Sequence, residues 1–156
     1  MKYYNIFLLD NYEITVIEEA GNIIGLSFGK WIPDGAENKL TPLLLKTKKQ
    51  LEEYFGGKRK IFDLPLRPMG TPFQQTVWKA LQTIPYGETR TYQDIAIQIG
   101  NEKACRAVGM ANNKNPIGIV IPCHRVIGKN GGLTGYAGGL DKKEYLLKVE
   151  KGKLKI

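Results

Sequence analysis

An apolar run of five residues leads directly into the most reactive part of this chain. Residues 117–121 read Ile-Gly-Ile-Val-Ile, and an Asn-Pro pair precedes them. A short apolar run bounded by a turn signal is typical of a fully buried strand, and Pro122 ends it because proline has no N–H for a ladder. Cys123, His124 and Arg125 follow as consecutive residues. We therefore expect a buried strand that brings a thiol, an imidazole and a guanidinium to one point.

The chemistry of these residues favours a nucleophile. The thiolate is the reactive form of cysteine, and a nearby imidazole or guanidinium favours it. A cysteine after a strand is more often an inert packing residue, but here titratable groups are concentrated where a fold would otherwise hold apolar ones. Neighbouring residues do not face each other, so we expect His124, the one histidine of the chain, to accept the Cys123 proton through a water molecule. Arg125 is expected to pair with a carboxylate rather than with phosphate.

Composition and charge narrow the class of protein. The chain has 156 residues and a net charge of +8; residues 1–70 carry 10 Lys/Arg against 9 Asp/Glu, and residues 71–156 carry 13 against 6. The positive electrostatic field of residues 71–156 would attract a polyanion, although a basic solvated surface explains the charge equally well. The apolar runs of the chain are too short to span a membrane. Two cysteines give no disulfide framework, so we expect a cytoplasmic protein, and one histidine cannot build a zinc site.

The first part of the chain is expected to form a small sheet with one helix. Residues 3–9, 12–19 and 23–28 are short β-branched and aromatic segments, separated by Asp-Asn and Gly-Asn turns. A Thr-Pro pair at residues 41–42 is a helix start, and a Gly-Gly pair at 56–57 ends that helix. The pattern predicts a three-stranded antiparallel sheet and a helix, with no chemistry of their own.

The second part is expected to be mostly helical. Thr-Pro-Phe-Gln at residues 71–74 and Thr-Tyr-Gln-Asp at 91–94 are capping boxes, and apolar residues recur at helical spacing after each. A helix that ends at Gly100 and another from 103 to about 112, capped by Asn101, form a helix-turn-helix pattern. A last helix begins at Asp141. The fold class is therefore α/β, with a sheet lobe over residues 1–65 and a helical lobe over residues 70–156.

Taken together, these motifs resemble one family. The sequence Pro-Cys-His-Arg-Val at residues 122–126, with Arg-Ala-Val-Gly at 106–109, Asn-Pro at 115–116 and Gly-Tyr at 135–136, is similar to that of the O6-alkylguanine-DNA alkyltransferases. The resemblance is close over roughly residues 70–150 and loose before them. It implies a ribonuclease-H-like first lobe and a DNA repair protein that moves an alkyl group from O6-alkylguanine to Cys123. It implies no cofactor and no metal.

The resemblance also assigns residues to DNA. A lesion inside a duplex must be flipped out of the stack to reach a buried thiol. The family uses residues matching Tyr92 and Arg106 for this step, and approaches the minor groove with a helix of small residues, here including Ala107 and Gly109. Asn115 would be a hinge before the active-site strand, although an Asn-Pro turn explains it as well. The expected partner is double-stranded DNA that contains O6-alkylguanine, bound by a monomer.

The flipped base needs a pocket and the histidine needs an orienting group. The resemblance implies that the base lies against Tyr92, Cys123, Val126, Tyr136 and Ala137, where the family often has serine at the last position. Residues 128–139 are rich in glycine and would form a wall of the pocket, or simply a surface loop. Glu144 is the candidate to orient His124, but it also completes a capping box with Asp141. These two readings have equal weight.

Two other functions remain open from sequence alone. A protein that binds alkylated bases without chemistry would not need Cys123. A Cys-His hydrolase would release its acyl group and turn over, whereas an alkylated sulfur is a thioether without a good leaving group. We therefore expect a single-turnover DNA methyltransferase; the range of alkyl groups it accepts is not encoded in any motif.

Overall fold

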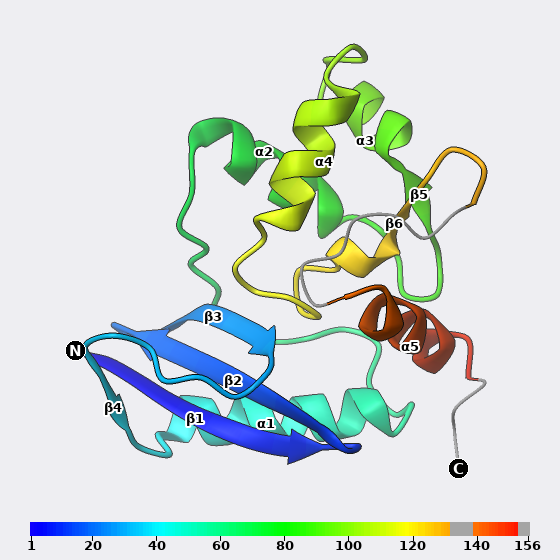
Figure 1. Cartoon of the computed structure of the whole chain (residues 1–156). Coiled ribbons are helices and arrows are strands. Elements are labelled where there is room, and N and C mark those ends of the chain that lie inside the picture. The colour runs from blue at the N-terminus through cyan, green and yellow to red at the C-terminus, as the bar shows by residue number, and fades with distance from the viewer. Residues whose placement is uncertain (132–138, 153–156) are drawn as a thin grey trace.

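The fold of the first lobe is a sheet covered on one face by a helix. The computed structural model describes residues 1–131 and 139–152. Strands β1 (Lys2–Leu9), β2 (Tyr12–Glu19) and β3 (Asn22–Phe28) form the antiparallel meander that the sequence predicts, in the order β3-β2-β1-β4. The short β4 (Ala36–Asn38) pairs parallel to β1 and was not predicted, because three residues carry too weak a pattern. Helix α1 (Pro42–Phe55) packs against β1 and β2 (Figure 1).

Turn chemistry explains the meander. Asp10 and Asn11 both have positive φ, as the two-residue turns that best connect twisted antiparallel strands require. The second turn is formed by Ala20 and Gly21, also at positive φ, so the expected Gly-Asn turn is wrong by one residue and Asn22 already belongs to β3. The predicted hairpins are thus confirmed with one shifted turn.

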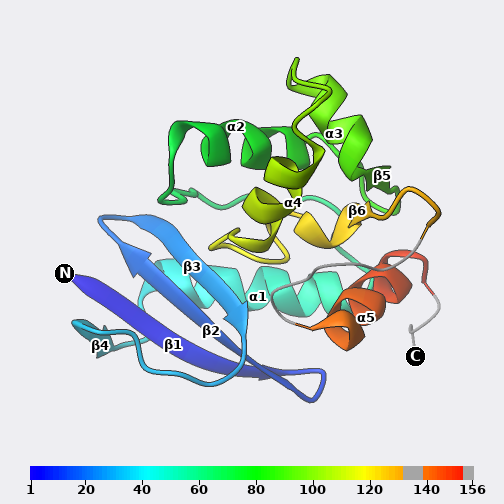
Figure 2. The same cartoon turned by 45° about the horizontal axis from the view of Figure 1, so that its top comes forward.

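The second lobe is helical, as predicted. Its elements are α2 (Pro72–Leu81), β5 (Arg90–Thr91), α3 (Tyr92–Gln98), α4 (Cys105–Asn113), the 3₁₀ helix η1 (Cys123–Arg125), β6 (Val126–Ile127) and α5 (Leu140–Glu150). The capping boxes at Thr71 and Thr91 are both formed. Helix α4 begins later than expected, and Ala104 rather than Asn101 is its N-cap residue. Helix α4 packs against both α2 and α3, and Figure 2 shows it between them.

The apolar run before the nucleophile is not a strand, which corrects the expectation. Ile117 makes one bridge to Leu26, and residues 118–121 then form turns in which Ile119 has a φ of 69°. Ile121 N–H donates back to the Ile117 carbonyl at 3.1 Å. The run is apolar because Ile117, Ile119 and Ile121 are all buried, not because they lie in a sheet. Burial produces the same sequence pattern in a turn as in a strand.

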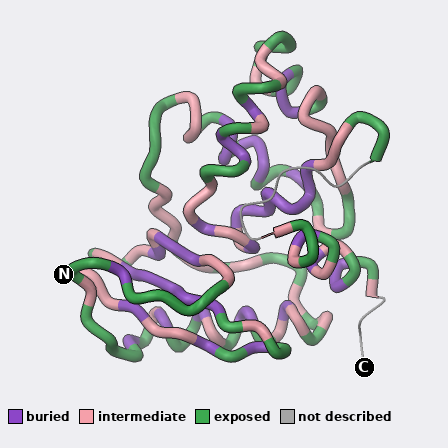
Figure 3. Tube along the Cα trace, in the orientation of Figure 1, coloured by how far each residue is buried: buried purple, intermediate pink, exposed green. Residues whose placement is uncertain are grey.

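The two lobes are joined along the outer edge of β3. Leu26 donates to the Pro116 carbonyl at 2.9 Å and accepts from Gly118 N–H at 2.8 Å, while Ile23 pairs in the same way with the chain at Pro65 and Arg67. These segments satisfy an edge that would otherwise be unpaired. One buried cluster runs through both lobes (Figure 3). In the part of the chain described, no helix is long and apolar enough to cross a membrane.

Candidate active site

Cys123 lies at the first position of η1, directly after the turn and Pro122. Its N–H donates to the Ile121 carbonyl at 2.8 Å, and the residue is only 5% exposed. Burial raises the pKa of the thiol to about 11, although a hydrogen bond from Asn115 and the positive charge of Lys143 act in the opposite direction. The thiol is therefore protonated at rest, and a nucleophilic role requires a base.

His124 is the base that the site offers. Its ring is completely buried, and Nε2 lies 2.5 Å from Oε2 of Glu150. Burial lowers the pKa of His124, partly offset by Glu150, so the neutral imidazole is favoured. A neutral ring that donates Nε2–H to a carboxylate keeps Nδ1 as an acceptor. Nδ1 is buried and has no hydrogen-bond partner among the described residues.

Glu150 is the residue that orients His124. Arg125 donates to both carboxylate oxygens, from Nε at 2.9 Å and from Nη2 at 3.0 Å. The hydroxyl of Tyr54 donates to Oε2 at 2.6 Å, and Gly87 N–H donates to Oε1 at 3.1 Å. Burial alone would raise the pKa of Glu150, but the hydrogen bonds and charges of His124 and Arg125 outweigh it and hold the pKa well below its usual range. The carboxylate thus stays ionised.

The expectation that Glu144 orients His124 is wrong. Its carboxylate pairs with Lys148 at 2.9 Å and is 54% exposed. The competing capping box is not formed either, because Gly139 is the N-cap residue and no side chain caps the helix. Glu150 lies six residues further along α5, about 240° around the helix axis at 3.6 residues per turn. The two carboxylates therefore face different surroundings.

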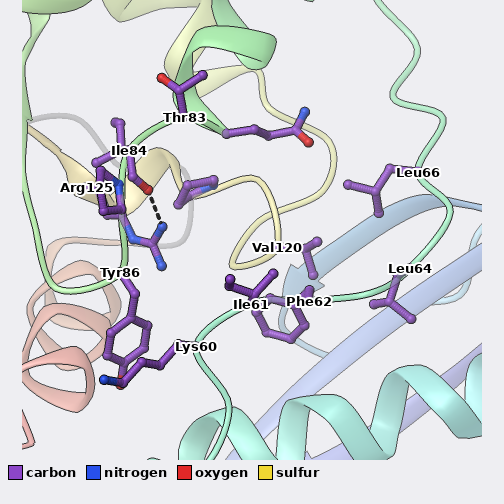
Figure 4. A pocket seen from close by; sticks show the side chains of 13 residues that line it. Lys60, Ile61, Phe62, Leu64, Leu66, Thr83, Ile84, Tyr86, Val120 and Arg125 are labelled. Carbon is purple, nitrogen blue, oxygen red and sulfur yellow. Dashed lines mark hydrogen bonds between the residues drawn. The ribbon is translucent and has the colours of Figure 1, made fainter.

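Arg125 pins the 3₁₀ helix to a carboxylate, as predicted, and the carboxylate is that of Glu150. Its Nη1 also donates to the Ile84 carbonyl at 2.7 Å, which ties η1 to the segment that follows α2 (Figure 4). The same guanidinium lines a cavity of about 590 Å³ between the linker and the segment that follows α2. Cys123 is not among the described residues that line this cavity, so the cavity is not the space next to the thiol.

Two asparagines of the preceding segment hold the nucleophile. Asn115 donates from Nδ2 to the Ile121 carbonyl at 2.9 Å and accepts from Ile117 N–H at 3.0 Å, in addition to its hydrogen bond with the thiol. Asn112 donates to the Cys123 carbonyl at 3.3 Å. Asn115 therefore builds the turn and contacts the sulfur, and the contact with the sulfur was not anticipated.

Lys143 is a functional candidate that sequence reasoning missed. The residue is completely buried on α5, and Nζ lies 5.9 Å from the ring centroid of Tyr92. Burial lowers the pKa of Lys143 to about 8, partly offset by the charge of Cys123. Its sequence signal is its spacing: Lys143, Leu146 and Glu150 recur at intervals of three and four residues, which place them on one buried face of a helix.

The residues assigned to DNA lie on α3, α4 and the segment that follows α4. Tyr92 is partly buried at the start of α3, and its ring lies 3.8 Å from where a Cβ at Gly109 would stand. Arg106 and Ala107 are exposed on α4. The structure thus brings Tyr92 and Gly109 together and leaves Arg106 and Ala107 on the surface. Asn115 is not among the exposed residues and lies beside the thiol.

The expected base pocket is only partly described. Val126 is buried in β6, paired with Arg90 of β5. Tyr136 and Ala137 lie outside the described residues, as does most of the glycine-rich segment. A cavity of about 370 Å³ flanks Tyr92, with Cys105 and Lys129 among its lining residues. Among the residues described, His, Cys, Asp and Glu do not gather in any group of three that could hold a metal ion.

The chain is similar to known proteins over nearly its whole length. Residues 72–152 match the DNA binding domain of 6-O-methylguanine DNA methyltransferase, and residues 4–68 match the ribonuclease-like domain of the same family. A methylated-DNA–protein-cysteine methyltransferase of Methanosarcina mazei is 54% identical, covering 98% of this chain and 99% of the relative. The constitutive enzyme of that name from Bacillus subtilis is 49% identical, covering 97% and 96%.

Solved structures agree with the fold. The O6-methylguanine methyltransferase of Mycobacterium tuberculosis superposes with a TM-score of 0.88 at 42% identity, covering 97% of this chain and 94% of that one. The same organism's protein, in complex with DNA, has a TM-score of 0.89 at 42% identity and the same coverage. The predicted α/β fold and the stated resemblance are thus confirmed. Two matching domains and full-length relatives well above 30% identity lead to one conclusion: the chain belongs to the 6-O-methylguanine DNA methyltransferase family.

Proposed function

We propose that this protein repairs DNA by moving an alkyl group from O6 of guanine directly to the sulfur of Cys123. The observation that carries the proposal is the buried series Cys123, His124 and Glu150, in which a carboxylate fixes one ring nitrogen and leaves the other as an acceptor. Family membership and relatives named methylated-DNA–protein-cysteine methyltransferase support the same reaction.

The first step is deprotonation of the thiol. A water molecule between Sγ of Cys123 and Nδ1 of His124 passes the proton to the ring, because adjacent residues cannot bond directly. Glu150, already ionised, stabilises the imidazolium that forms. Lys143 and Asn115 stabilise the thiolate, since both favour its charged form. The high resting pKa of Cys123 suits a sulfur that reacts only when a base and a substrate are in place.

The second step is displacement at carbon. The thiolate attacks the sp³ carbon attached to O6, an S–C bond forms and the C–O6 bond breaks. The departing guanine takes up one proton, which balances the proton that His124 took from the thiol. The product sulfur is a thioether, which has no good leaving group. Each molecule therefore accepts one alkyl group and is consumed.

The lesion reaches Cys123 by base flipping from the minor groove. Arg106 and Ala107 are exposed on α4, as an inserted arginine and a close backbone approach require. Tyr92 helps to rotate the nucleotide, and Gly109 lets α4 approach the DNA closely. Asn115 serves as the link between α4 and the nucleophile. The carbonyls of Cys123 and Val126, with Tyr92, Tyr136 and Ala137, form the base pocket.

The partner is duplex DNA that contains O6-alkylguanine. The solved complex of the M. tuberculosis protein with DNA supports a DNA partner, and the excess of positive charge after residue 70 supports a polyanion. We further propose that the protein acts as a monomer in the cytoplasm, where Cys123 stays reduced. Analytical ultracentrifugation of the protein, with and without lesion DNA, tests this proposal: the protein should sediment with the mass of one chain, alone and on the DNA.

Intact mass spectrometry tests the reaction. After incubation with DNA that carries O6-methylguanine, the peptide containing Cys123 should gain one methyl group per molecule, and the DNA should contain unmodified guanine. Cys123→Ser should leave the lesion in place. Repaired DNA without a labelled protein would indicate a hydrolase, and binding without repair would indicate a lesion-recognition protein; either result contradicts the proposal.

A further inference from the structure

The first lobe reaches into the active site through one side chain. Tyr54, near the end of α1, is completely buried, and its hydroxyl donates to Oε2 of Glu150 at 2.6 Å. The same oxygen lies 2.5 Å from Nε2 of His124. One carboxylate oxygen thus joins α1 of the first lobe to the imidazole beside the nucleophile, and Tyr54 and Glu150 are 96 residues apart in the chain.

Tyr54 is held firmly where it meets the carboxylate. Its ring packs against Phe62 at 5.3 Å and against Tyr86 at 6.1 Å between centroids. One turn earlier on α1, Gln50 exchanges two hydrogen bonds with the backbone of Asp63, at 2.9 and 3.1 Å, which fixes the linker over this region. Figures 1 and 2 show the C-terminal end of α1 beside α5. The hydroxyl therefore has a fixed direction.

The hydroxyl can only act as a donor here. Burial and the neighbouring charge of Glu150 raise the pKa of Tyr54 well above its ordinary value, so it keeps its proton at neutral pH. A donor on Oε2 withdraws negative charge from the oxygen that faces His124 and fixes its position. The other charged groups that face the His124 ring are Arg125 on η1 and Lys143 on α5, and both disfavour the imidazolium form of His124.

We propose that Tyr54 is a positioning residue for alkyl transfer, which acts through Glu150 on the geometry and basicity of His124. This inference rests on the function proposed above. Both lobes then contribute to the active site, because Cys123, His124 and Glu150 belong to the second lobe and Tyr54 belongs to the first.

A matched pair of variants tests this role. Tyr54→Phe removes only the hydroxyl that bonds Glu150. Tyr86→Phe removes a neighbouring hydroxyl that is 3.4 Å from the Val149 carbonyl, and so serves as the control. Because each molecule reacts once, the number of methyl groups accepted per molecule measures the folded, active fraction separately from the rate constant.

We expect Tyr54→Phe to accept the same number of methyl groups as the wild type, with a rate constant about tenfold lower at neutral pH, because Glu150 no longer holds His124 in a fixed orientation and the ring is more often protonated. About tenfold is the scale of one hydrogen bond to a charged group. Tyr86→Phe should react at the wild-type rate. A reduced yield at an unchanged rate would show that Tyr54 only supports folding, and would overturn the inference. A wild-type protein that fails to label Cys123 would instead refute the proposed function.

The single histidine allows a second readout without DNA. Nitrogen NMR of His124 should show a proton on Nε2 in the wild type. Removing the Tyr54 donor leaves more charge on Glu150, which stabilises the imidazolium, so the pKa of His124 should rise in Tyr54→Phe and the acid limb of the rate profile should move to higher pH. Identical His124 titrations in Tyr54→Phe and Tyr86→Phe would overturn the inference.

Discussion

A buried thiol beside a buried lysine is the central electrostatic feature at the scale of single residues. Moving the thiolate of Cys123 out of water is unfavourable, and burial accordingly raises its pKa to about 11. Lys143 is also penalised by burial, with a pKa of about 8, so each group is disfavoured alone and favoured by the other. With a pKa of about 8, Lys143 is mostly protonated at neutral pH, so its positive charge is in place before the thiolate forms.

Lys143→Met should make Cys123 less reactive. With the ammonium removed, the pKa of the thiol should rise further above about 11, because a nearby positive charge favours the thiolate. A rise of one unit corresponds to roughly tenfold less thiolate at neutral pH. The rate at which iodoacetamide labels the Cys123 peptide, measured from pH 7 to 11, checks this.

Lys142→Met is the control for that experiment. Lys142 is the preceding residue of α5, and it pairs with Asp141 at 3.5 Å near the surface. Its removal takes away the same charge at a partly exposed site, where screening makes the effect small. Equal labelling rates for the two variants would contradict a specific action of Lys143.

At the scale of elements, α3 and α4 present the surface that the proposed function assigns to DNA. Tyr92 begins α3, where the capping box of Thr91 fixes the backbone, and its ring lies within van der Waals range of a Cβ placed at Gly109 on α4. The exposed side of α4 carries Arg106 and Ala107. An exposed arginine next to a small residue is what the proposed insertion into a groove requires.

Arg106→Ala should slow repair of duplex DNA more than repair of single-stranded DNA. An arginine that fills the space of a flipped base is needed only where a base stack must be kept open. We expect a rate roughly tenfold or more lower on the duplex, taking the loss of a few kcal/mol per disrupted stack as the scale. Single-turnover rates on the two substrates check this expectation.

Lys114→Ala provides the comparison for Arg106. Lys114 is exposed directly after the C-terminus of α4 and carries the same charge. Its loss should reduce the salt dependence of binding without a preference for duplex or single strand, as for a phosphate contact. An Arg106→Ala protein that behaves in this way would show that Arg106 binds phosphate instead.

At the scale of the whole molecule, Glu150 connects parts of the chain that are distant in sequence. It accepts hydrogen bonds from Tyr54 on α1, Gly87 before β5, and His124 and Arg125 on η1. A buried carboxylate with so many donors holds the two lobes and the 3₁₀ helix in one arrangement. The same residue therefore affects both folding and the proposed chemistry.

Glu150→Gln should be destabilised at neutral pH by about 3–5 kcal/mol, since it leaves a buried arginine without its counter-charge. The folded pKa of Glu150 is lowered, so its stabilisation is present above the unfolded pKa of about 4.3 and is lost as the pH falls. The difference from the wild type should therefore shrink between pH 7 and pH 3, as measured by urea unfolding.

Glu144→Gln gives the contrast on the same helix. Glu144 forms a surface pair with Lys148, and such pairs contribute about 0–1 kcal/mol. Its unfolding curve should follow that of the wild type at every pH. A difference for Glu150→Gln that stays constant down to pH 3 would show that the charge of Glu150 is not the source of the stability.

Local signals in the sequence determined much of this protein. The sequence predicted the features that depend only on neighbours within a few residues. These are the capping boxes at Thr71 and Thr91, the Asp-Asn hairpin after β1 and the order Pro-Cys-His-Arg. The proposed nucleophile, its proposed base and the carboxylate pairing of Arg125 followed from those signals.

Only the tertiary structure decided which partners meet. The run before Cys123 became a turn because both lobes bury it, and burial leaves the same apolar pattern in a strand or a turn. Glu150 rather than Glu144 faces His124 because the rotation of α5 against η1 is set by packing. Tyr54 joins them from another lobe, since a contact across 96 residues depends on how the lobes dock and leaves no local signal in the sequence.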